Sequence, residues 1–302
     1  MIKTFPKIFT VGQDYISDLF KEEVEITEKI DGSQFCFGKI EGELYIRSKG
    51  AMLYKENPQD MFKEAVDYVI SIENKIPDNT VFYCEYLRIP HHNVLKYDRI
   101  PKNHLILFGV SDATGTKFIS THTDLTKYAT KLDIDVVPLL HYGKVDNIKL
   151  LDKLLDTDSV LGGTKVEGVV IKNYFRQFLL GGQPIPVMMG KYVSEKFKEV
   201  HKSSWGRLHT GKGKWEMFKE SFATEVRWLK AIQHLQEKGE LENSPRDIGK
   251  LIQEIKKDIE EEEKENIIKF LWKTFGEEVL RSSTRGFPEF YKRYLAEKAL
   301  KK

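Results

Sequence analysis

The chain has little of three features that would each assign it to a particular class of protein. Its 302 residues include only two cysteines, Cys36 and Cys84, both in apolar runs typical of strands. This excludes a disulfide-rich secreted scaffold and predicts a reduced, cytoplasmic protein. The formal net charge is only +2, so any surface for nucleic acid must be local. No apolar run approaches the length of a membrane span, and the N-terminus lacks a hydrophobic signal segment.

Hydrophobic residues make up 40% of the chain and charged residues 31%, as in a soluble globular protein long enough for one large or two ordinary domains. Up to about residue 200, the spacing of the apolar residues predicts alternating short strands and helices, and beyond it the spacing is helical. We therefore predict an α+β fold, with one domain over residues 1–204 and a small all-helical domain over residues 205–302.

Apolar spacing and turn residues also predict the individual elements. Helices are expected from residue 57, over 124–132, 148–155 and 215–237, and in three further segments after Ser244, around 248–255, 267–272 and 287–300. Strands are expected over 80–87, 104–110, 136–140, 165–173 and 187–193.

The segment from Glu28 to Gln34 carries the most specific chemistry. Lys29, Asp31 and Gly32 form the pattern Lys-x-Asp-Gly between two strand-like stretches. A lysine at the point where a strand gives way to a glycine-containing turn can project into a cleft. There its amine can attack phosphorus or a carbonyl, if burial or neighbouring cations lower its pKa. On its own the pattern is equally compatible with a surface hairpin that carries a solvated lysine.

Five further segments follow this pattern along the chain. They are Arg47-Ser48-Lys49-Gly50, Tyr83-Cys84-Glu85-Tyr86, Leu107-Phe108-Gly109-Val110, Glu167-Gly168-Val169-Val170-Ile171-Lys172 and Met189-Gly190-Lys191-Tyr192. With Lys29-Ile30-Asp31-Gly32 before them, they resemble the ordered motifs of the covalent nucleotidyltransferases, which include polynucleotide ligases and messenger-RNA capping enzymes. The set is most similar to the phage RNA ligase 2 family. The motifs cover about residues 5 to 200, and the helical remainder resembles that family in architecture only.

The resemblance implies an antiparallel-sheet nucleotidyltransferase domain with an ATP-grasp-like ligase fold, followed by a helical domain that engages nucleic acid. It implies an ATP-dependent RNA ligase that joins a 3′-hydroxyl end to a 5′-phosphate end through a lysyl-AMP intermediate and an adenylylated RNA end. Its cofactors would be ATP and Mg²⁺ or Mn²⁺, its partner a nicked or bridged RNA duplex, and we expect a monomer. The alternatives are a capping-type guanylyltransferase and a non-catalytic RNA-binding module on a ligase fold.

The resemblance also implies catalytic roles for three lysines and a metal-binding role for one glutamate. Lys29 would attack the α-phosphate of ATP. Lys172 and Lys191 would stabilise the charge on the phosphate and, with a metal, depress the pKa of Lys29. Glu167 would hold the metal ion, partly through water.

Binding roles follow in the same way. Glu85 would contact the ribose, and Phe108 would stack on adenine. The residues implied for ATP are Glu28, Lys29, Asp31, Gly32, Glu85, Phe108, Lys172 and Lys191. Those implied for RNA are Gln34, Arg47 and Lys49, and the planar fork of Arg47 suits a 5′-phosphate.

Several of these residues also have ordinary structural interpretations. Glu85 and Glu167 could face solvent from strands, Phe108 could pack in the core, and Ser33 could be a turn residue only. The pair His91-His92 lacks partners at metal-ligand spacing, so we expect no metal site there.

The chain departs from the family pattern at three positions. Gln34 stands where asparagine is usual, Cys84 where glycine is usual, and Val193 where a second lysine follows Lys191. Met189, Lys191 and Val193 would share one face of a strand, so an apolar side chain would point at the α-phosphate. Either Lys196 supplies the missing charge, with Phe197 beside it as in the family, or the remaining lysines suffice.

Overall fold

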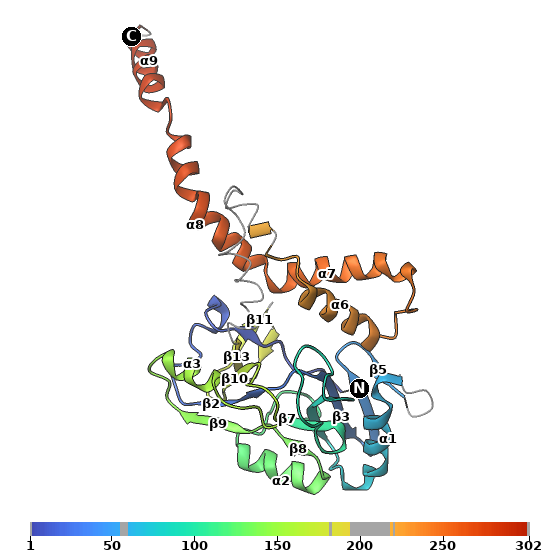
Figure 1. Cartoon of the computed structure of the whole chain (residues 1–302). Helices are drawn as coiled ribbons and strands as arrows, with labels where there is room; N and C mark the ends of the chain where they lie inside the picture. The colour runs from blue at the N-terminus through green and yellow to red at the C-terminus, as the bar shows by residue number, and fades with distance from the viewer. Residues whose placement is uncertain (1, 55–59, 181–182, 194–217, 220, 301–302) are drawn as a thin grey trace. The chain divides into compact units, whose positions relative to one another are not determined.

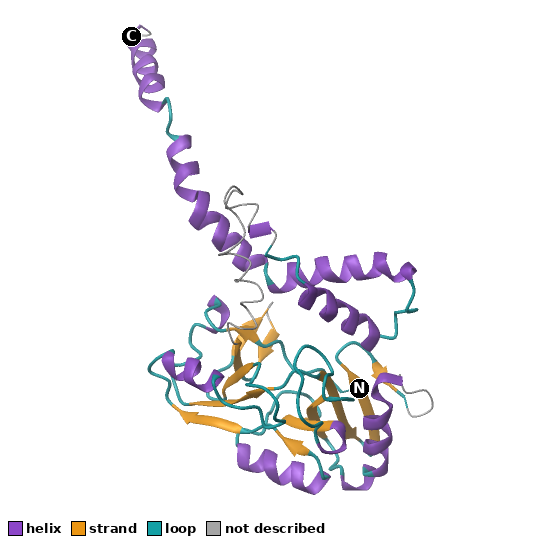
Figure 2. Cartoon of the chain, in the orientation of Figure 1, coloured by secondary structure: helices purple, strands orange, loops and turns teal. Residues whose placement is uncertain are grey.

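A computed structural model of the chain describes residues 2–54, 60–180, 183–193, 218–219 and 221–300 (Figure 1). The chain divides into two compact units, Met1–Ser244 and Pro245–Lys302. All described strands belong to the first unit, and the described elements of the second unit are helical (Figure 2). The predicted α+β class is confirmed. The predicted boundary after residue 204 falls outside the described residues.

The first sheet carries the lysine of the Lys-x-Asp-Gly pattern at the end of one of its inner strands. Its strand order is β1-β13-β10-β2-β9, and neighbours are antiparallel except for the parallel pair β1 and β13. The strands are β1 (Phe9–Thr10), β2 (Val24–Lys29), β9 (Leu139–Gly143), β10 (Gly168–Asn173) and β13 (Met188–Val193).

Alternation along these strands separates a core face from a site face. The core face is formed by Val24, Ile26, Val169, Ile171 and Met188, all buried and packed together. Helix α3 (Lys149–Leu155) contributes Leu151 to the same cluster. Lys29 lies on the opposite face, which is therefore the face available for chemistry.

The second sheet contains β3, the strand that directly follows the lysine turn in the chain. Its order is β5-β4-β3-β6-β7-β8, antiparallel except between β7 and β8. Helices α1 (Lys63–Ser71) and α2 (His122–Leu132) pack on one face of it, over a cluster that includes Phe35, Phe37 and Phe82. The strands are β3 (Ser33–Ile40), β4 (Glu43–Ser48), β5 (Met52–Leu53), β6 (Thr80–Tyr86), β7 (Leu105–Asp112) and β8 (Asp135–Val136).

Shorter elements complete the first unit. They are the 3-10 turns Asp14–Ile16, Asp60–Phe62, Glu73–Lys75 and Lys102–His104, the hairpin of β11 (Phe178–Leu180) and β12 (Gln183–Ile185), and helix α6 (Glu225–Glu237). Helix α6 begins after Thr224, whose hydroxyl accepts a hydrogen bond from the backbone N–H of Arg227.

The second unit contains α7 (Ile248–Glu262), α8 (Lys264–Ser283) and α9 (Phe287–Leu300), preceded by a 3-10 turn at Pro245–Asp247. The three helices predicted after Ser244 are thereby confirmed. None of the helices that the structure describes combines the length and the apolar character needed to cross a membrane.

Two predicted elements were wrong in extent. The single strand expected over 136–140 is two strands, β8 and β9, which belong to different sheets. Pro138 separates them because it cannot donate to a strand ladder. The single helix expected over 215–237 is also interrupted, since α6 starts only at Glu225. Phe218 and Phe222 precede it and pack edge to face, with ring centroids 5.0 Å apart.

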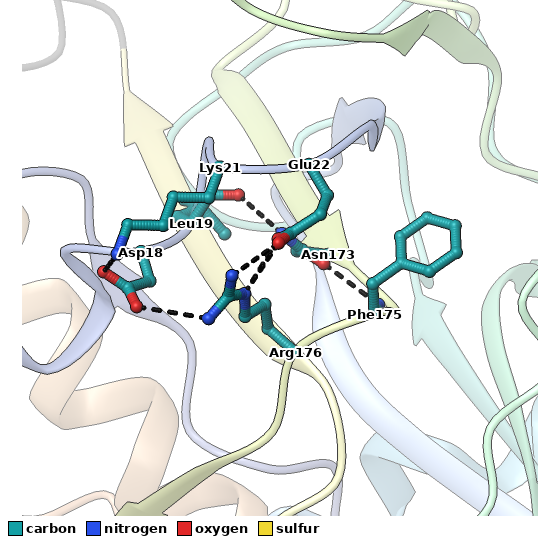
Figure 3. Close-up of polar contacts among 7 residues, drawn as sticks. All are labelled: Asp18, Leu19, Lys21, Glu22, Asn173, Phe175 and Arg176. Carbon is teal, nitrogen blue, oxygen red and sulfur yellow. Dashed lines mark hydrogen bonds and ion pairs between the residues drawn. The ribbon is translucent and has the colours of Figure 1, made fainter.

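A polar cluster lies at the end of β10 that is remote from Lys29 (Figure 3). The fully buried amide of Asn173 donates to the carbonyl oxygen of Leu19 at 2.9 Å and to the Glu22 carboxylate at 3.1 Å. Arg176 donates to both oxygens of Glu22, and its hydrogen bonds lower the pKa of that carboxyl to about 2. The cluster ties the chain before β2 to the chain after β10, and so supports the strand pair that carries the site.

Candidate active site

Lys29 lies at the end of β2 in a row of paired residues. Gly168 of β10 is its partner, and Val193 of β13 is the partner of Gly168. A Cβ atom on Gly168 would lie 2.7 Å from the carbonyl oxygen of Tyr192 and 2.9 Å from the Cα of Val193. Position 168 can therefore carry no side chain. Three of the predicted motifs, those that contain Lys29, Gly168 and Lys191, meet at this row.

The amine of Lys29 is paired with the carboxylate of Glu167, which immediately precedes β10. The Nζ atom lies 2.5 Å from Oε2 of Glu167. Burial favours the neutral amine, but the carboxylates of Glu167, Asp31 and Glu85 outweigh it and raise the pKa of Lys29. The expectation that Lys172, Lys191 and a metal depress this pKa concerns the site with its metal and stays a prediction, because the charged groups that act on Lys29 in the chain alone are carboxylates.

Glu85 is a half-buried residue whose carboxylate faces the same region from β6. Its Oε2 atom is buried and has no hydrogen-bond partner. Burial, opposed by the charge of Lys29 and reinforced by other carboxylates, raises the pKa of Glu85 to about 8. An acceptor buried without a partner is costly, which is the usual signature of a group that meets a ligand.

The turn after Lys29 is held by the loop that follows β6. The carboxylate of Asp31 accepts hydrogen bonds from the backbone N–H groups of Val94 and Leu95, both at 2.8 Å. Its own N–H donates to the Tyr97 hydroxyl at 2.9 Å. A Cβ atom on Gly32 would lie 2.9 Å from the carbonyl oxygen of Tyr86, so glycine is needed for this close approach. Asp31 thus orders the turn that follows Lys29.

Ser33 is more than a turn residue. Its buried hydroxyl lies 2.8 Å from Nε2 of His92 and accepts a hydrogen bond from the side-chain amide of Gln233 at 2.8 Å. The same Gln233 amide donates to the Glu237 carboxylate at 2.7 Å. Gln233 and Glu237 belong to α6, so this helix reaches the strand that follows the lysine turn.

Lys172 lies on the site face, but at the other end of β10. It pairs with Glu25, four residues before Lys29 on β2, or about 13 Å along the strand. Its Nζ donates to the carbonyl oxygen of Phe108 at 2.6 Å and lies 3.7 Å from the Glu25 carboxylate. The structure therefore does not bring Lys172 to the amine of Lys29.

Phe108 lies at an irregularity of β7. Tyr83 pairs with Gly109 and Cys84 with Leu107, so Phe108 has no partner on β6. Its ring packs edge to face on Phe5, with centroids 4.9 Å apart, and it remains partly exposed. Core packing is thus observed for Phe108, and the exposed part of the ring leaves adenine stacking as a proposal.

Lys191 and Val193 lie where the pattern predicted. Met189, Lys191 and Val193 pair with Lys172, Val170 and Gly168 and hence share the site face. Lys191 is close enough to Glu167 to lower the pKa of that carboxyl, against the larger effect of burial. The proposed substitute for the missing lysine, Lys196, and its neighbour Phe197 lie outside the described residues.

The residues implied for RNA binding come from β3 and β4. Gln34 pairs with Glu85 and therefore shares its face of the second sheet, and its buried Oε1 has no hydrogen-bond partner. Arg47 donates to the carbonyl oxygens of Ile2 at 3.0 Å and Ser48 at 3.2 Å. Lys49 follows β4 and is exposed.

Glu28 is a predicted residue that faces away from this arrangement. Its side chain points to the face of β2 opposite Lys29, where Ser159 donates to it at 2.5 Å and the Val160 N–H at 3.0 Å. The structure does not bring its carboxylate together with the other residues implied for ATP.

The donor set fits a small divalent cation that is only partly held by the protein. Glu85 offers a buried oxygen without a partner, and Glu167 offers a carboxylate beside Lys29. Mg²⁺ and Mn²⁺ prefer oxygen ligands, and Mg²⁺ keeps several waters beside one or two carboxylates and substrate phosphates. Within the described part of the chain, no group of three or more His, Cys, Asp or Glu residues could hold a metal on its own.

Sequence reasoning missed the residues that support the site from behind. They are Glu25, His92, Tyr97, Gln233 and Glu237. Most lie far along the chain from their partners and belong to no motif. The only signal was the pair His91-His92, which we considered as metal ligands and not as hydrogen-bond donors.

The RNA ligase family model matches residues 22–187, more than half of the chain. The chain therefore belongs to the RNA ligase family. No curated protein matches it significantly.

Among solved structures, similar chains are RNA ligases of Naegleria gruberi. A variant with ATP and Mn is 16% identical, over 67% of this chain and 58% of that chain, with a TM-score of 0.48. A second variant with AMP and Mn has the same identity, coverage and TM-score. The ligase with PPi is 18% identical, over 67% and 61% of the two chains, with a TM-score of 0.45. The chain thus spans about 60% of the length of these solved structures.

Proposed function

We propose that the protein is an ATP-dependent RNA ligase that joins 3′-hydroxyl and 5′-phosphate ends through a lysyl-AMP intermediate. The observation that carries this proposal is the position of Lys29. Its amine lies 2.5 Å from Glu167 and within the field of Glu85, in the row where β2, β10 and β13 meet. Membership of the RNA ligase family supports the same reaction.

In the first step the neutral amine of Lys29 attacks the α-phosphorus of ATP. A bond forms between Nζ and phosphorus, the bond from phosphorus to the bridging oxygen breaks, and pyrophosphate leaves. The nitrogen gives up one proton to water as the phosphoramidate forms. Lys191 is proposed to stabilise charge on the phosphate oxygens, and its position on the same face of the sheet supports this role.

Two further steps would seal the RNA. The 5′-phosphate attacks the phosphorus of lysyl-AMP, the bond to Nζ breaks, and the adenylylated RNA end forms. The 3′-hydroxyl then attacks the 5′-phosphorus, and AMP leaves. Gln34, Arg47 and Lys49 are proposed to hold the RNA, since all three lie on or beside β3 and β4.

Mg²⁺ or Mn²⁺ is proposed to be held by Glu167 and Glu85. When bound, it supplies positive charge that neutralises these carboxylates and so favours the neutral form of the lysine. The buried, unpartnered oxygen of Glu85 supports this assignment. The same atom could instead accept a hydrogen bond from the ribose.

The protein is further proposed to act as a cytoplasmic monomer on nicked or bridged RNA duplexes, with the helical C-terminal region helping to engage the nucleic acid. Both proposals rest on the cysteine content and on the resemblance to the RNA ligase 2 family.

The deciding experiment is incubation with labelled ATP or labelled GTP and Mg²⁺ or Mn²⁺, followed by a denaturing gel. A labelled band with ATP that is absent in Lys29→Ala supports the ligase. A band with GTP only would identify a capping-type guanylyltransferase. Binding of RNA without either band would identify a non-catalytic module.

A further inference from the structure

Helix α6 presents two polar side chains to the region of the lysine turn, the half-buried amide of Gln233 and the buried carboxylate of Glu237. Gln233 and Glu237 are one helical turn apart and therefore share a face of the helix. Glu237 is only 3% exposed, and Ala231 and Leu235 are buried beside it. Burying a carboxylate and an amide is costly unless their hydrogen bonds are made, so the contacts of these two residues must be favourable.

Those contacts satisfy Ser33 completely. Nδ1 of His92 accepts the backbone N–H of Arg88 at 3.1 Å, so its Nε2 carries the proton and donates to the Ser33 hydroxyl. Gln233 donates to the same oxygen at 2.8 Å. The hydroxyl proton of Ser33 is then directed to Glu237. Two accepted hydrogen bonds and one donated bond leave no rotational freedom for this side chain.

Helix α6 also contacts the turn through the Gln233 amide, and β4 through the backbone carbonyl of Glu237. The amide lies 3.5 Å from the carbonyl oxygen of Gly32, and the Ser48 hydroxyl donates to the carbonyl oxygen of Glu237 at 3.4 Å. The loop at Asn93 and Leu95 holds the other side of the same turn through Asp31. The strand that begins after Lys29 is thus held from two directions.

From this arrangement we infer that Gln233 is a positioning residue for lysine adenylylation, which acts through Ser33 to hold the turn that aims Lys29. The inference rests on the proposed ligase function and goes beyond it, because it makes a helix outside the motif region part of the adenylylation site. A displacement of a reacting group by about 1 Å can cost about 10²-fold in rate. A loosened turn should therefore slow the attack of Lys29 on ATP without weakening the binding of ATP.

The test compares Gln233→Met with Gln236→Met in the full-length chain. Gln236 is on the same helix and is exposed, so it controls for the substitution itself. Single-turnover formation of lysyl-AMP is measured over a range of ATP concentrations, and the wild type is measured first. If the wild type forms no adduct, the ligase proposal is refuted, and this inference is not the part that failed. We expect Gln233→Met to lower the rate at saturating ATP by about 10- to 100-fold, with the half-saturating ATP concentration little changed. Equal rates for the two variants would overturn the inference.

A double-mutant cycle tests whether the effect passes through Ser33. Ser33→Ala should slow the reaction, and Ser33→Thr, which retains the hydroxyl, should recover most of it. Adding Gln233→Met to Ser33→Ala should cost nothing more, because the shared contact is already lost. If the double variant instead shows the product of the two single rate losses, Gln233 acts by a route other than Ser33. If Gln233→Met does not fold, Gln233→Ala and Gln233→Asn are measured against the same control, and a wild-type rate in either folded variant overturns the inference.

Discussion

Two lysine–glutamate pairs lie on the same face of the first sheet, and their surroundings give them opposite properties. Lys29 and Glu167 are 2.5 Å apart, and the lysine side chain keeps 28% of its surface exposed. Lys172 and Glu25 are 3.7 Å apart and almost completely buried. The pKa of Lys29 is raised because several carboxylates outweigh burial. The pKa of Lys172 is lowered because burial outweighs the single carboxylate of Glu25.

The comparison shows that the number of neighbouring carboxylates decides whether the pKa of a lysine in this sheet is raised or lowered. The three acidic groups around Lys29 make a site that is prepared for added positive charge and phosphate. The single partner of Lys172, together with the Phe108 carbonyl oxygen, makes a contact that joins the two sheets. We therefore interpret the first pair as reactive. The second pair is structural in the chain without its substrates, and the catalytic role of Lys172 stays a proposal.

The largest expected effect is at Lys29. Lys29→Ala should abolish lysyl-AMP formation, because the row of Lys29, Gly168 and Val193 then carries no amine. Sealing of RNA that already carries an adenylylated 5′ end should survive in part, since the nucleophile is no longer needed. Both activities are measured beside Lys153→Ala, an exposed control. Complete loss of both in a folded protein would contradict the assignment.

The next effect is expected at Lys172 and concerns stability. Lys172→Met should lower the free energy of unfolding by about 3–5 kcal/mol, because it leaves Glu25 buried without its partner. The double variant Lys172→Met with Glu25→Gln should recover part of this loss. Urea unfolding of the three proteins provides the measurement. If Lys172→Met is as stable as the wild type but has lost adenylylation, the structural interpretation of Lys172 is wrong and Lys172 is a catalytic cation.

A smaller, pH-dependent effect is expected at Glu85. Its pKa rises from an ordinary value of 4.5 to about 8 in the folded chain, so the folded state binds the proton more tightly than the unfolded state. This contribution to stability is complete below about pH 4.5 and is lost as the pH rises towards 8. Glu85→Gln should therefore gain in melting temperature relative to the wild type between pH 5 and pH 9. A constant difference across that range would show that Glu85 is not buried as described.

The smallest effect is expected at the half-exposed pair of Glu22 and Arg176. Arginine lowers the pKa of Glu22 to about 2, so the stabilising contribution is present above pH 4.5 and is lost as the pH falls towards 2. Melting temperatures of the wild type and Glu22→Gln should converge between pH 4.5 and pH 2.5, and added salt should reduce their difference at neutral pH. Parallel curves would mean that the pair contributes nothing to the pH dependence.

Most helices and strands could be predicted from the sequence, because apolar periodicity reports local structure. The grouping of Lys29, Glu167 and Glu85 could be predicted from the order of the motifs, because that order reflects a shared ancestry of the site. It could not predict the partners of Ser33 and Asp31, since hydrogen bonds between His92, Gln233 and the lysine turn leave no periodic pattern. The direction of the pKa shift at Lys29 was also beyond reach. It depends on which charged groups lie close to the amine, and in the chain alone these are carboxylates.

The placement of β2 inside its sheet has a consequence for the growing polypeptide. Its two neighbours, β9 and β10, begin at Leu139 and Gly168, more than a hundred residues after Lys29. At about 5–20 residues per second, the ribosome needs roughly 5 to 20 seconds to supply the first of them. The second sheet, whose β3 and β4 form a local hairpin, can begin to form during that interval. Strand β2 is made early but can pair with its neighbours only late. Until then, newly made chains must keep the apolar side of β2 from associating with other proteins.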